Sequence, residues 1–126
     1  MELEFYICPI CGNIVTKIKD SKVPVFCCGQ PMKLLVANTT DAAQEKHVPL
    51  VAIENNEVRV KVGSVEHPQI PEHFIEFIAL ETNLGFSVQH LLPNSKPEAT
   101  FALTSGEKVK NVFAYCNLHS LWKKSL

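Results

Sequence analysis

Apolar and polar residues alternate along most of the chain with the two-residue period of β-strands. In the first part the alternating stretches are short, and turn-forming segments separate them. Further along they lengthen, and Gly, Pro and Asn stand between them. The expected strands are ELEFYI (2–7), NIVTKI (13–18), VPVF (23–26), HVPLVAI (47–53), EVRVKVG (57–63), HFIEFIALE (73–81), FSVQHLL (86–92), ATFAL (99–103) and VKNVFAYC (109–116). No long helical pattern occurs, so the sequence predicts an all-β protein.

The chain is expected to form two domains, 1–36 and 37–126. Residues 38–46, NTTDAAQEK, are polar and lack strand periodicity, which indicates a linker and loop with one helical turn at residues 41–44. Beyond this segment, short strands follow one another with turns between them, beginning with a hairpin around ENNE (54–57). Such spacing is typical of an antiparallel β-sandwich. The first 36 residues are too few to fold on hydrophobic burial alone, and their cysteines lie at the turns.

Composition narrows the possible partners. The 126 residues carry 12 basic and 13 acidic side chains, a net charge of -1, and the basic residues form no stripe. We therefore expect no nucleic-acid partner. Apolar runs are too short to cross a bilayer and no signal peptide is evident, so we expect a cytoplasmic protein that does not bind membranes. The five cysteines are an odd number, which argues for metal binding over a disulfide framework.

Four cysteines form the first candidate metal site: Cys8, Cys11, Cys27 and Cys28. Cys8 and Cys11 enclose a tight turn whose backbone amides can point at sulfur, and Gly12 gives that turn its freedom. Cys27 and Cys28 are adjacent, so both reach one metal only if the backbone bends. Four thiolates suit tetrahedral iron or zinc equally well. A disulfide switch between Cys8 and Cys11 would leave the other pair unexplained.

A second candidate site combines four histidines with the remaining cysteine. These residues fall at the ends of expected strands or in loops: His47, His67, His73, Cys116 and His119. His90 lies inside an expected strand and is interpreted as an ordinary histidine. Five donors on a metal that prefers six leave one position open, and iron fits this donor set best. Backbone amides of Leu118 and His119 follow Cys116 closely enough to donate to its sulfur.

Two charged residues precede His47. Four neutral imidazoles and one thiolate on Fe(II) leave a net positive charge, which attracts a small anion, and Lys46 would add to that attraction. Glu45 is placed to supply a carboxylate ligand after oxidation. Exposed Glu and Lys in a polar loop are usually only solvated, and their position beside a candidate ligand is what distinguishes these two.

The motifs CPICGNIV, FCCGQPMKLL, NTTDAAQEKHVP, GSVEHP, EHFIEFI and YCNLHSLW, in this order, resemble the desulfoferrodoxin family, the two-iron form of superoxide reductase. The resemblance implies a desulforedoxin-like N-terminal domain and an immunoglobulin-like sandwich. It implies an Fe(Cys)₄ centre at Cys8, Cys11, Cys27 and Cys28. It also implies an Fe(His)₄(Cys) centre with His47, His67, His73 and His119 in the plane and Cys116 on the axis. Glu45 matches the sixth ligand of the oxidised state, and Lys46 matches the cation beside the open position.

The implied activity is one-electron reduction of superoxide to hydrogen peroxide, with electrons from a rubredoxin-type donor and protons from water. The axial thiolate would donate electron density to iron and ease release of peroxide. The resemblance also implies a homodimer. Alternatives remain open: a non-catalytic two-iron electron carrier, a zinc-bound interaction module, and a thiol hydrolase built on Cys116 and His119.

Overall fold

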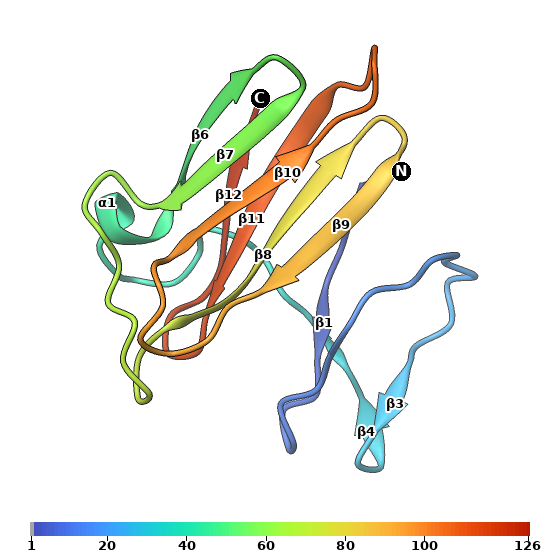
Figure 1. The fold of residues 1–126 in the computed structure, drawn as a ribbon. Coiled ribbons are helices and arrows are strands. Elements are labelled where there is room, and N and C mark those ends of the chain that lie inside the picture. Colours follow the sequence, from blue (N-terminus) through green and yellow to red (C-terminus); the bar gives the residue numbers. More distant parts are fainter. Residues whose placement is uncertain (1) are drawn as a thin grey trace. The chain divides into compact units, whose positions relative to one another are not determined.

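A computed structural model describes residues 2–126 of the chain (Figure 1). The chain divides into two compact units, with the division after Val36, and each unit has its own sheets. Apart from the four-residue helix α1 (Gln44–His47), all regular structure in the described residues is β-strand, and these residues contain no helix long and apolar enough to cross a membrane. The expectation of an all-β protein is confirmed.

The first unit has very little regular structure. Its three-stranded sheet has the order β2-β1-β5, and β3 and β4 form a separate hairpin. Each strand has two residues: β1 Tyr6–Ile7, β2 Ile14–Val15, β3 Phe26–Cys27, β4 Gln30–Pro31 and β5 Lys33–Leu34. Among residues 2–36 only Phe5 and Cys8 are buried, whereas Ile10, Ile18 and Phe26 are largely exposed. Apolar burial in this unit is therefore small, as the sequence predicts.

The second unit is an antiparallel sandwich of two sheets. The orders are β10-β7-β6 in one sheet and β12-β11-β8-β9 in the other (Figure 1). The strands are β6 Pro49–Glu54, β7 Glu57–Val62, β8 Ile75–Thr82, β9 Gly85–His90, β10 Glu98–Ala102, β11 Val109–Cys116 and β12 Ser120–Ser125. Every pairing between these strands is antiparallel. The predicted sandwich is thus confirmed.

The core of the second unit lies between the two sheets. Along β7, buried Val58, Val60 and Val62 alternate with exposed residues, and they belong to one apolar cluster with Ile78 of β8 and Val112 of β11. This cluster also includes Cys116, the last residue of β11. The core therefore reaches the end of the sandwich at which the candidate histidines lie.

Two elements differ from the sequence prediction. Strand β12 was not predicted, because its two lysines mask the apolar pattern of a strand whose only fully buried positions are Leu121 and Trp122. The helical turn, α1, spans Gln44–His47 and so begins three residues later than expected. The backbone N–H of Val48 closes it by donating to the Gln44 carbonyl at 2.9 Å. The shift places His47 inside the turn.

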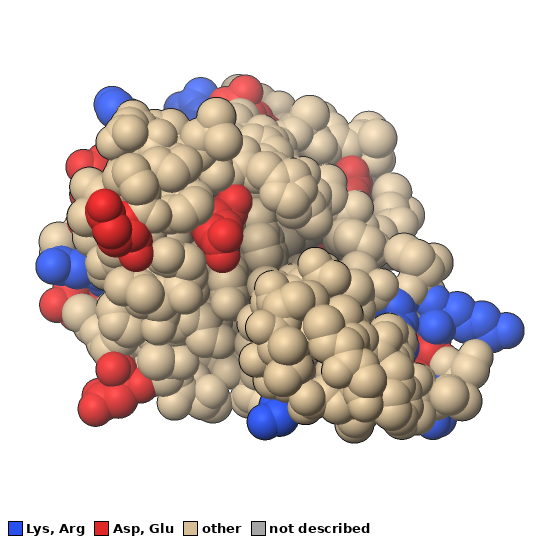
Figure 2. Space-filling model, turned by 90° about the horizontal axis from the view of Figure 1, so that it is seen from below, with Lys and Arg blue, Asp and Glu red and all other residues tan. Residues whose placement is uncertain are grey.

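Charged side chains of both signs occur on the surface. On the face shown in Figure 2, both signs occur and wide uncharged areas separate most of the charged groups. This distribution agrees with the near balance of 12 basic and 13 acidic residues.

Candidate metal centres

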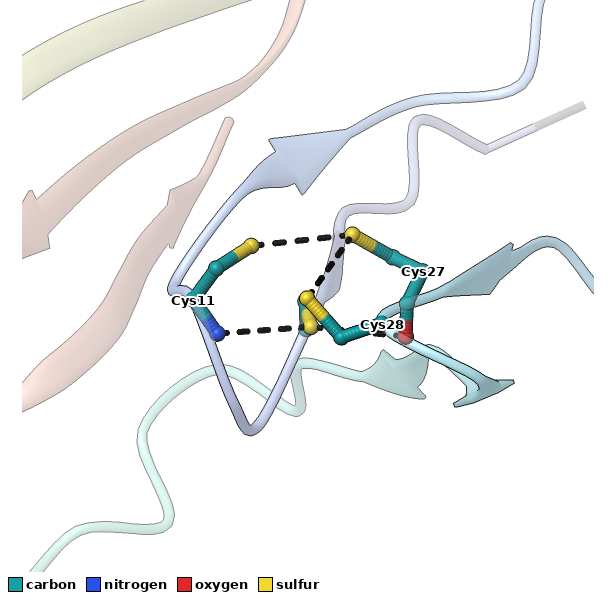
Figure 3. A group of neighbouring side chains, drawn as sticks. Cys11, Cys27 and Cys28 are labelled. Carbon is teal, nitrogen blue, oxygen red and sulfur yellow. Dashed lines mark hydrogen bonds between the residues drawn. The ribbon is translucent and has the colours of Figure 1, made fainter.

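The first donor set consists of the four cysteine thiols of the first unit. Their sulfur atoms all lie within 4.8 Å of one another. Cys11 Sγ is 3.6 Å from Cys27 Sγ, and Cys27 Sγ is 4.0 Å from Cys28 Sγ (Figure 3). Four sulfurs bound tetrahedrally at about 2.3 Å from one metal would be about 3.8 Å apart. The observed spacing therefore fits a tetrahedral metal ion.

Backbone amides point at the sulfurs of the Cys8–Cys11 turn, as the sequence predicts. The amide of Cys11 donates to Cys8 Sγ, and that of Asn13 donates to Cys11 Sγ, each at 3.5 Å. Gly12 has a φ of 81°, which a residue with a side chain rarely adopts. The Cys11 amide is the main cause that lowers the pKa of Cys8, to about 6. Cys8 is therefore prepared to bind metal as a thiolate.

Cys27 and Cys28 reach the same point because the chain reverses at the second of them. Cys28 has a φ of 53° and Gly29 a φ of 78°, so both central residues of the β3–β4 turn are left-handed, as in a type I′ hairpin turn. The predicted bend is confirmed. Contacts with the Cys11 and Cys8 sulfurs raise the pKa of Cys28 to about 12. Four thiolates can therefore coexist here only with a cation between them.

The second donor set forms at one end of the sandwich, from four separate segments. His47 ends α1, His67 follows β7, and His73 precedes β8; Cys116 ends β11, and His119 lies in the turn to β12. Donor atoms of His47, His67, His73 and Cys116 lie within 4.8 Å of one another. His119 Nδ1 is 3.1 Å from His47 Nε2 and 3.8 Å from Cys116 Sγ. All five predicted residues therefore meet.

The four imidazoles close into a ring. Neighbouring ring centroids are separated by 4.7 Å (His47–His67), 4.7 Å (His67–His73), 5.1 Å (His73–His119) and 4.9 Å (His119–His47). Across the ring, His47 and His73 are 6.5 Å apart. These lengths describe a nearly square arrangement. It differs from a tetrahedral one and leaves room for donors above and below the square.

Hydrogen bonds fix which nitrogen of His47 and His67 faces inward. Nδ1 of His47 bonds to the Ala43 carbonyl and Nδ1 of His67 to the Pro68 carbonyl, each at 2.7 Å. A carbonyl only accepts, so both Nδ1 atoms carry the proton and both Nε2 atoms present a lone pair. Those two Nε2 atoms are 3.1 Å apart. Two lone pairs at this distance repel unless a cation lies between them.

A metal ion fits this arrangement better than a proton. Burial lowers the pKa of His67 to about 4 and is also the main cause that lowers the pKa of His47 and His73. The imidazoles of these three residues therefore stay neutral at pH 7. His73 Nε2 is buried without a hydrogen-bond partner, which is costly unless a metal binds it. Nitrogens bound at right angles at about 2.1 Å from one ion would be about 3.0 Å apart, close to the observed 3.1 Å.

The pH dependence of metal binding tests these protonation states. From pH 7 to pH 5 we expect the affinity of the second donor set for Fe(II) to fall at least tenfold per pH unit, the slope for release of at least one proton. That proton comes from Cys116, whose pKa is raised by burial. Because the pKa of His67 is about 4, protonation of His67 competes with metal binding only below pH 5. Chelator competition at several pH values measures the slope, and a slope clearly below one proton would contradict the expectation.

The sulfur of Cys116 lies on the core side of the histidine ring. Cys116 is fully buried, whereas His73 and His119 are only half-buried. Burial is the main cause that raises the pKa of Cys116, and the backbone N–H groups of Leu118 and His119 oppose it. The predicted amide contacts to this sulfur are therefore confirmed, and they compensate part of the cost of a buried thiolate.

Trp122 is a residue of this site that sequence reasoning did not find. Its buried indole stacks on His47 with a centroid separation of 4.8 Å, and its Nε1–H donates to the His119 carbonyl at 2.9 Å. One side chain thus touches two of the histidine segments. The signal was the tryptophan that ends the YCNLHSLW motif, but only the pairing of β12 with β11 shows where its ring lies.

Lys46 and Glu45 are both exposed, in the turn that carries His47. The charge of Lys46, after burial and the charge of His119, contributes to the lowered pKa of His73, so Lys46 acts electrostatically on the ring. Among the described residues, the Glu45 carboxylate makes no hydrogen bond or ion pair, while its backbone carbonyl accepts from the Val65 amide at 2.9 Å. A ligand role for Glu45 stays a prediction. His90 is exposed at the end of β9, outside both donor sets.

Comparison with known proteins identifies the family. Residues 39–125 match the family model described as desulfoferrodoxin, and residues 1–35 match the one described as desulfoferrodoxin, N-terminal domain. The chain belongs to the desulfoferrodoxin family. A desulfoferrodoxin of Syntrophotalea carbinolica is 50% identical over 122 residues, covering 96% of this chain and 94% of its own.

Solved structures with a similar fold include superoxide reductases. The crystal structure of the superoxide reductase from Treponema pallidum has a TM-score of 0.84 and 36% identity, covering 99% of this chain and 100% of its own. The one-iron superoxide reductase from Giardia intestinalis has a TM-score of 0.57 and 34% identity, covering 65% of this chain and 97% of its own. The desulfoferrodoxin family and these neighbours support an oxidoreductase with two metal sites, and the two donor sets fit that description.

Proposed function

We propose that this protein is a superoxide reductase, which converts superoxide, one electron and two protons into hydrogen peroxide at an iron held by the second donor set. The observation that carries the proposal is the square of four imidazoles with a single buried thiol on its core side. Five donors of this kind leave one coordination position for a substrate. The named relatives support the same activity.

Iron bound there would supply a one-electron donor with an open coordination position. The residues of the chain determine what reaches it. Four neutral imidazoles and one thiolate carry a charge of -1 in total, so the site with Fe(II) is positive overall and attracts an anion. Lys46 adds a positive charge from the exposed turn beside His47. The Ala43 and Pro68 carbonyls hold two of the imidazoles in the tautomer that binds metal.

The remaining parts of the proposal rest on the family resemblance. The first donor set would hold an iron in a closed shell of four thiolates, suited to electron transfer. A rubredoxin-type carrier would deliver electrons, Glu45 would bind the oxidised second iron, and protons would come from water. The active form would be a homodimer. Glu45 is exposed, and its carboxylate makes no hydrogen bond or ion pair among the described residues, so it has the freedom this role requires.

The decisive experiment measures the products of superoxide consumption. Protein reconstituted with Fe(II) and a reductant is expected to consume superoxide and yield one peroxide per superoxide without evolving dioxygen. A dismutase would instead yield one peroxide and one dioxygen for every two superoxide ions. Evolution of dioxygen in that ratio, or no superoxide consumption above the rate in buffer alone, would contradict the proposal.

Binding of small ligands distinguishes the proposed enzyme from a non-catalytic electron carrier. If the second centre has an open position, azide or cyanide should change its spectrum and leave that of the four-thiolate centre unchanged. An electron carrier with two closed centres predicts no change in either spectrum. A zinc-bound interaction module predicts a colourless protein with no iron in metal analysis of the purified chain.

Substitution of Lys46 tests electrostatic attraction of the substrate. Lys46→Ala is expected to slow the second-order reaction with superoxide about 3- to 10-fold at low salt and to flatten its dependence on ionic strength. Lys46→Arg should keep most of the rate. Lys108→Ala removes an exposed lysine next to β11, at the other end of the strand from Cys116, and serves as the control. Pulse radiolysis measures the rates; an unchanged salt dependence in Lys46→Ala would count against attraction by this charge.

A further inference from the structure

His73 differs from the buried histidines His47 and His67 in how it is held. The rings of His47 and His67 are each anchored by a carbonyl on Nδ1. Among the described residues, the ring of His73 makes no hydrogen bond, and its buried Nε2 has no partner. A ring without an anchor takes its position from its backbone and packing alone. The residues that fix the backbone around His73 therefore determine where its nitrogen lies.

Asn117 binds that backbone on both sides of His73. Its Oδ1 accepts from the Phe74 amide at 2.9 Å, and its Nδ2 donates to the Glu72 carbonyl at 3.0 Å. Its own backbone amide donates to the Phe74 carbonyl at 3.2 Å. Asn117 follows Cys116 directly and lies in the turn that also carries His119. One side chain thus ties the His73 segment to the segment that supplies two other donors.

We propose that Asn117 is a positioning residue for the second metal centre, holding His73 at metal-binding distance by clamping the backbone of Glu72 and Phe74. Within residues 2–126, the backbone of His73 itself is held by a reciprocal pair of hydrogen bonds with Ile70, at 3.0 and 3.1 Å. That pair lies within the same loop and does not tie it to the segment that carries Cys116 and His119. Asn117 fixes the loop against β11, which the sandwich core holds rigidly.

The chain offers a closely matched control. Asn83 pairs with Lys108 as Asn117 pairs with Phe74: its backbone amide donates to the Lys108 carbonyl at 3.0 Å, and its Oδ1 accepts from the Lys108 amide at 2.8 Å. Asn83 lies in the β8–β9 turn, at the end of β8 away from Ile75 and the donor set. Asn83→Ala therefore removes an equivalent loop contact without touching the histidine segments.

The test measures metal affinity in the full-length protein, with Co(II) in competition with a chelator. In the same sample, a single-thiolate charge-transfer band reports the second centre, and the four-thiolate band reports the first. Asn117→Ala is expected to weaken Co(II) binding at the second centre about tenfold or more, the range for lost support of a ligand. Binding at the first centre should not change, and Asn83→Ala should change neither. An effect below twofold, or an equal effect in Asn83→Ala, would overturn the proposal.

Two further variants show whether Asn117 acts through His73. Asn117→Asp keeps the acceptor for the Phe74 amide and loses the donor to Glu72, so its affinity should lie between those of wild type and Asn117→Ala. In a His73→Ala background, Asn117→Ala should cost little further affinity, because the ligand it positions is already gone. A full additional loss in that background would overturn the proposal. The inference rests on a metal at this donor set and not on superoxide, which is absent from the assay, so the two proposals fail separately.

Discussion

Replacing Cys116 with serine is expected to abolish superoxide reduction and to remove the thiolate-to-metal charge-transfer band of the second centre. The first centre should keep its iron and its spectrum, because its four donors belong to a separate unit of the chain. Stopped-flow consumption of superoxide and visible absorption of the same iron-loaded sample measure the two effects.

The size of this effect follows from where the sulfur lies. Cys116 is fully buried in the sandwich core, and the amides of Leu118 and His119 favour its thiolate form. A serine hydroxyl in the same place stays protonated at neutral pH, so the donor set loses its one negative charge and its one soft ligand. A neutral oxygen in place of sulfur would also donate less electron density to iron than a thiolate does.

The control for this prediction is His90→Ala, which removes an exposed histidine at the end of β9. It should leave both spectra and the rate unchanged. If Cys116→Ser retained a turnover close to that of wild type with its iron in place, the sulfur would be a structural ligand and the proposed role for it would be wrong.

The strands of the sandwich were predictable because their pattern is local. Along β7 the alternation of buried valines with exposed residues is visible in the sequence EVRVKV itself. Strand β12 was not predictable in this way. Its inward positions are defined by antiparallel pairing with β11, which runs from Cys116 opposite Ser120 to Asn111 opposite Ser125. The late start of α1 likewise depends on a distant segment, because Val65 and Ser64 donate to the Glu45 carbonyl from the loop after β7.

For the candidate sites, residue types and spacing predicted the residues that the structure brings together in the two donor sets, but not how these residues are held. The predicted bend at Cys28 follows from chemistry, because two adjacent thiols cannot otherwise reach one ion. The tautomers of His47 and His67 depend on the Ala43 and Pro68 carbonyls, whose directions only the folded backbone determines. Asn117 and Trp122 act through contacts with segments far away in sequence, and no local pattern reveals these.

Removal of the metal from the first donor set is expected to unfold residues 2–36 while residues 37–126 stay folded. The first unit has five strands of two residues, and only Phe5 and Cys8 are buried among its described residues. That burial is too small to offset the conformational entropy of ordering about 35 residues. The second unit keeps its own apolar cluster between two sheets, which does not include the first donor set.

Without a cation, the first donor set also opposes its own fold. Four sulfurs within 4.8 Å of one another cannot all be ionised, and Cys28 is held in a left-handed conformation that favours glycine. Metal binding offsets both costs, so folding and metal binding of this unit should be a single transition.

Hydrogen exchange followed by mass spectrometry measures the expected result segment by segment. After the metal is removed under reducing conditions, amides of residues 2–36 should exchange at the rate of an unfolded chain, and those of β8 and β11 should stay protected. Adding Zn(II) should restore protection, because a tetrahedral site of four thiolates accepts zinc as well as iron. Persistent protection around Cys8 and Cys28 in the metal-free protein would show that apolar packing alone holds this unit, contrary to its two-residue strands and exposed side chains.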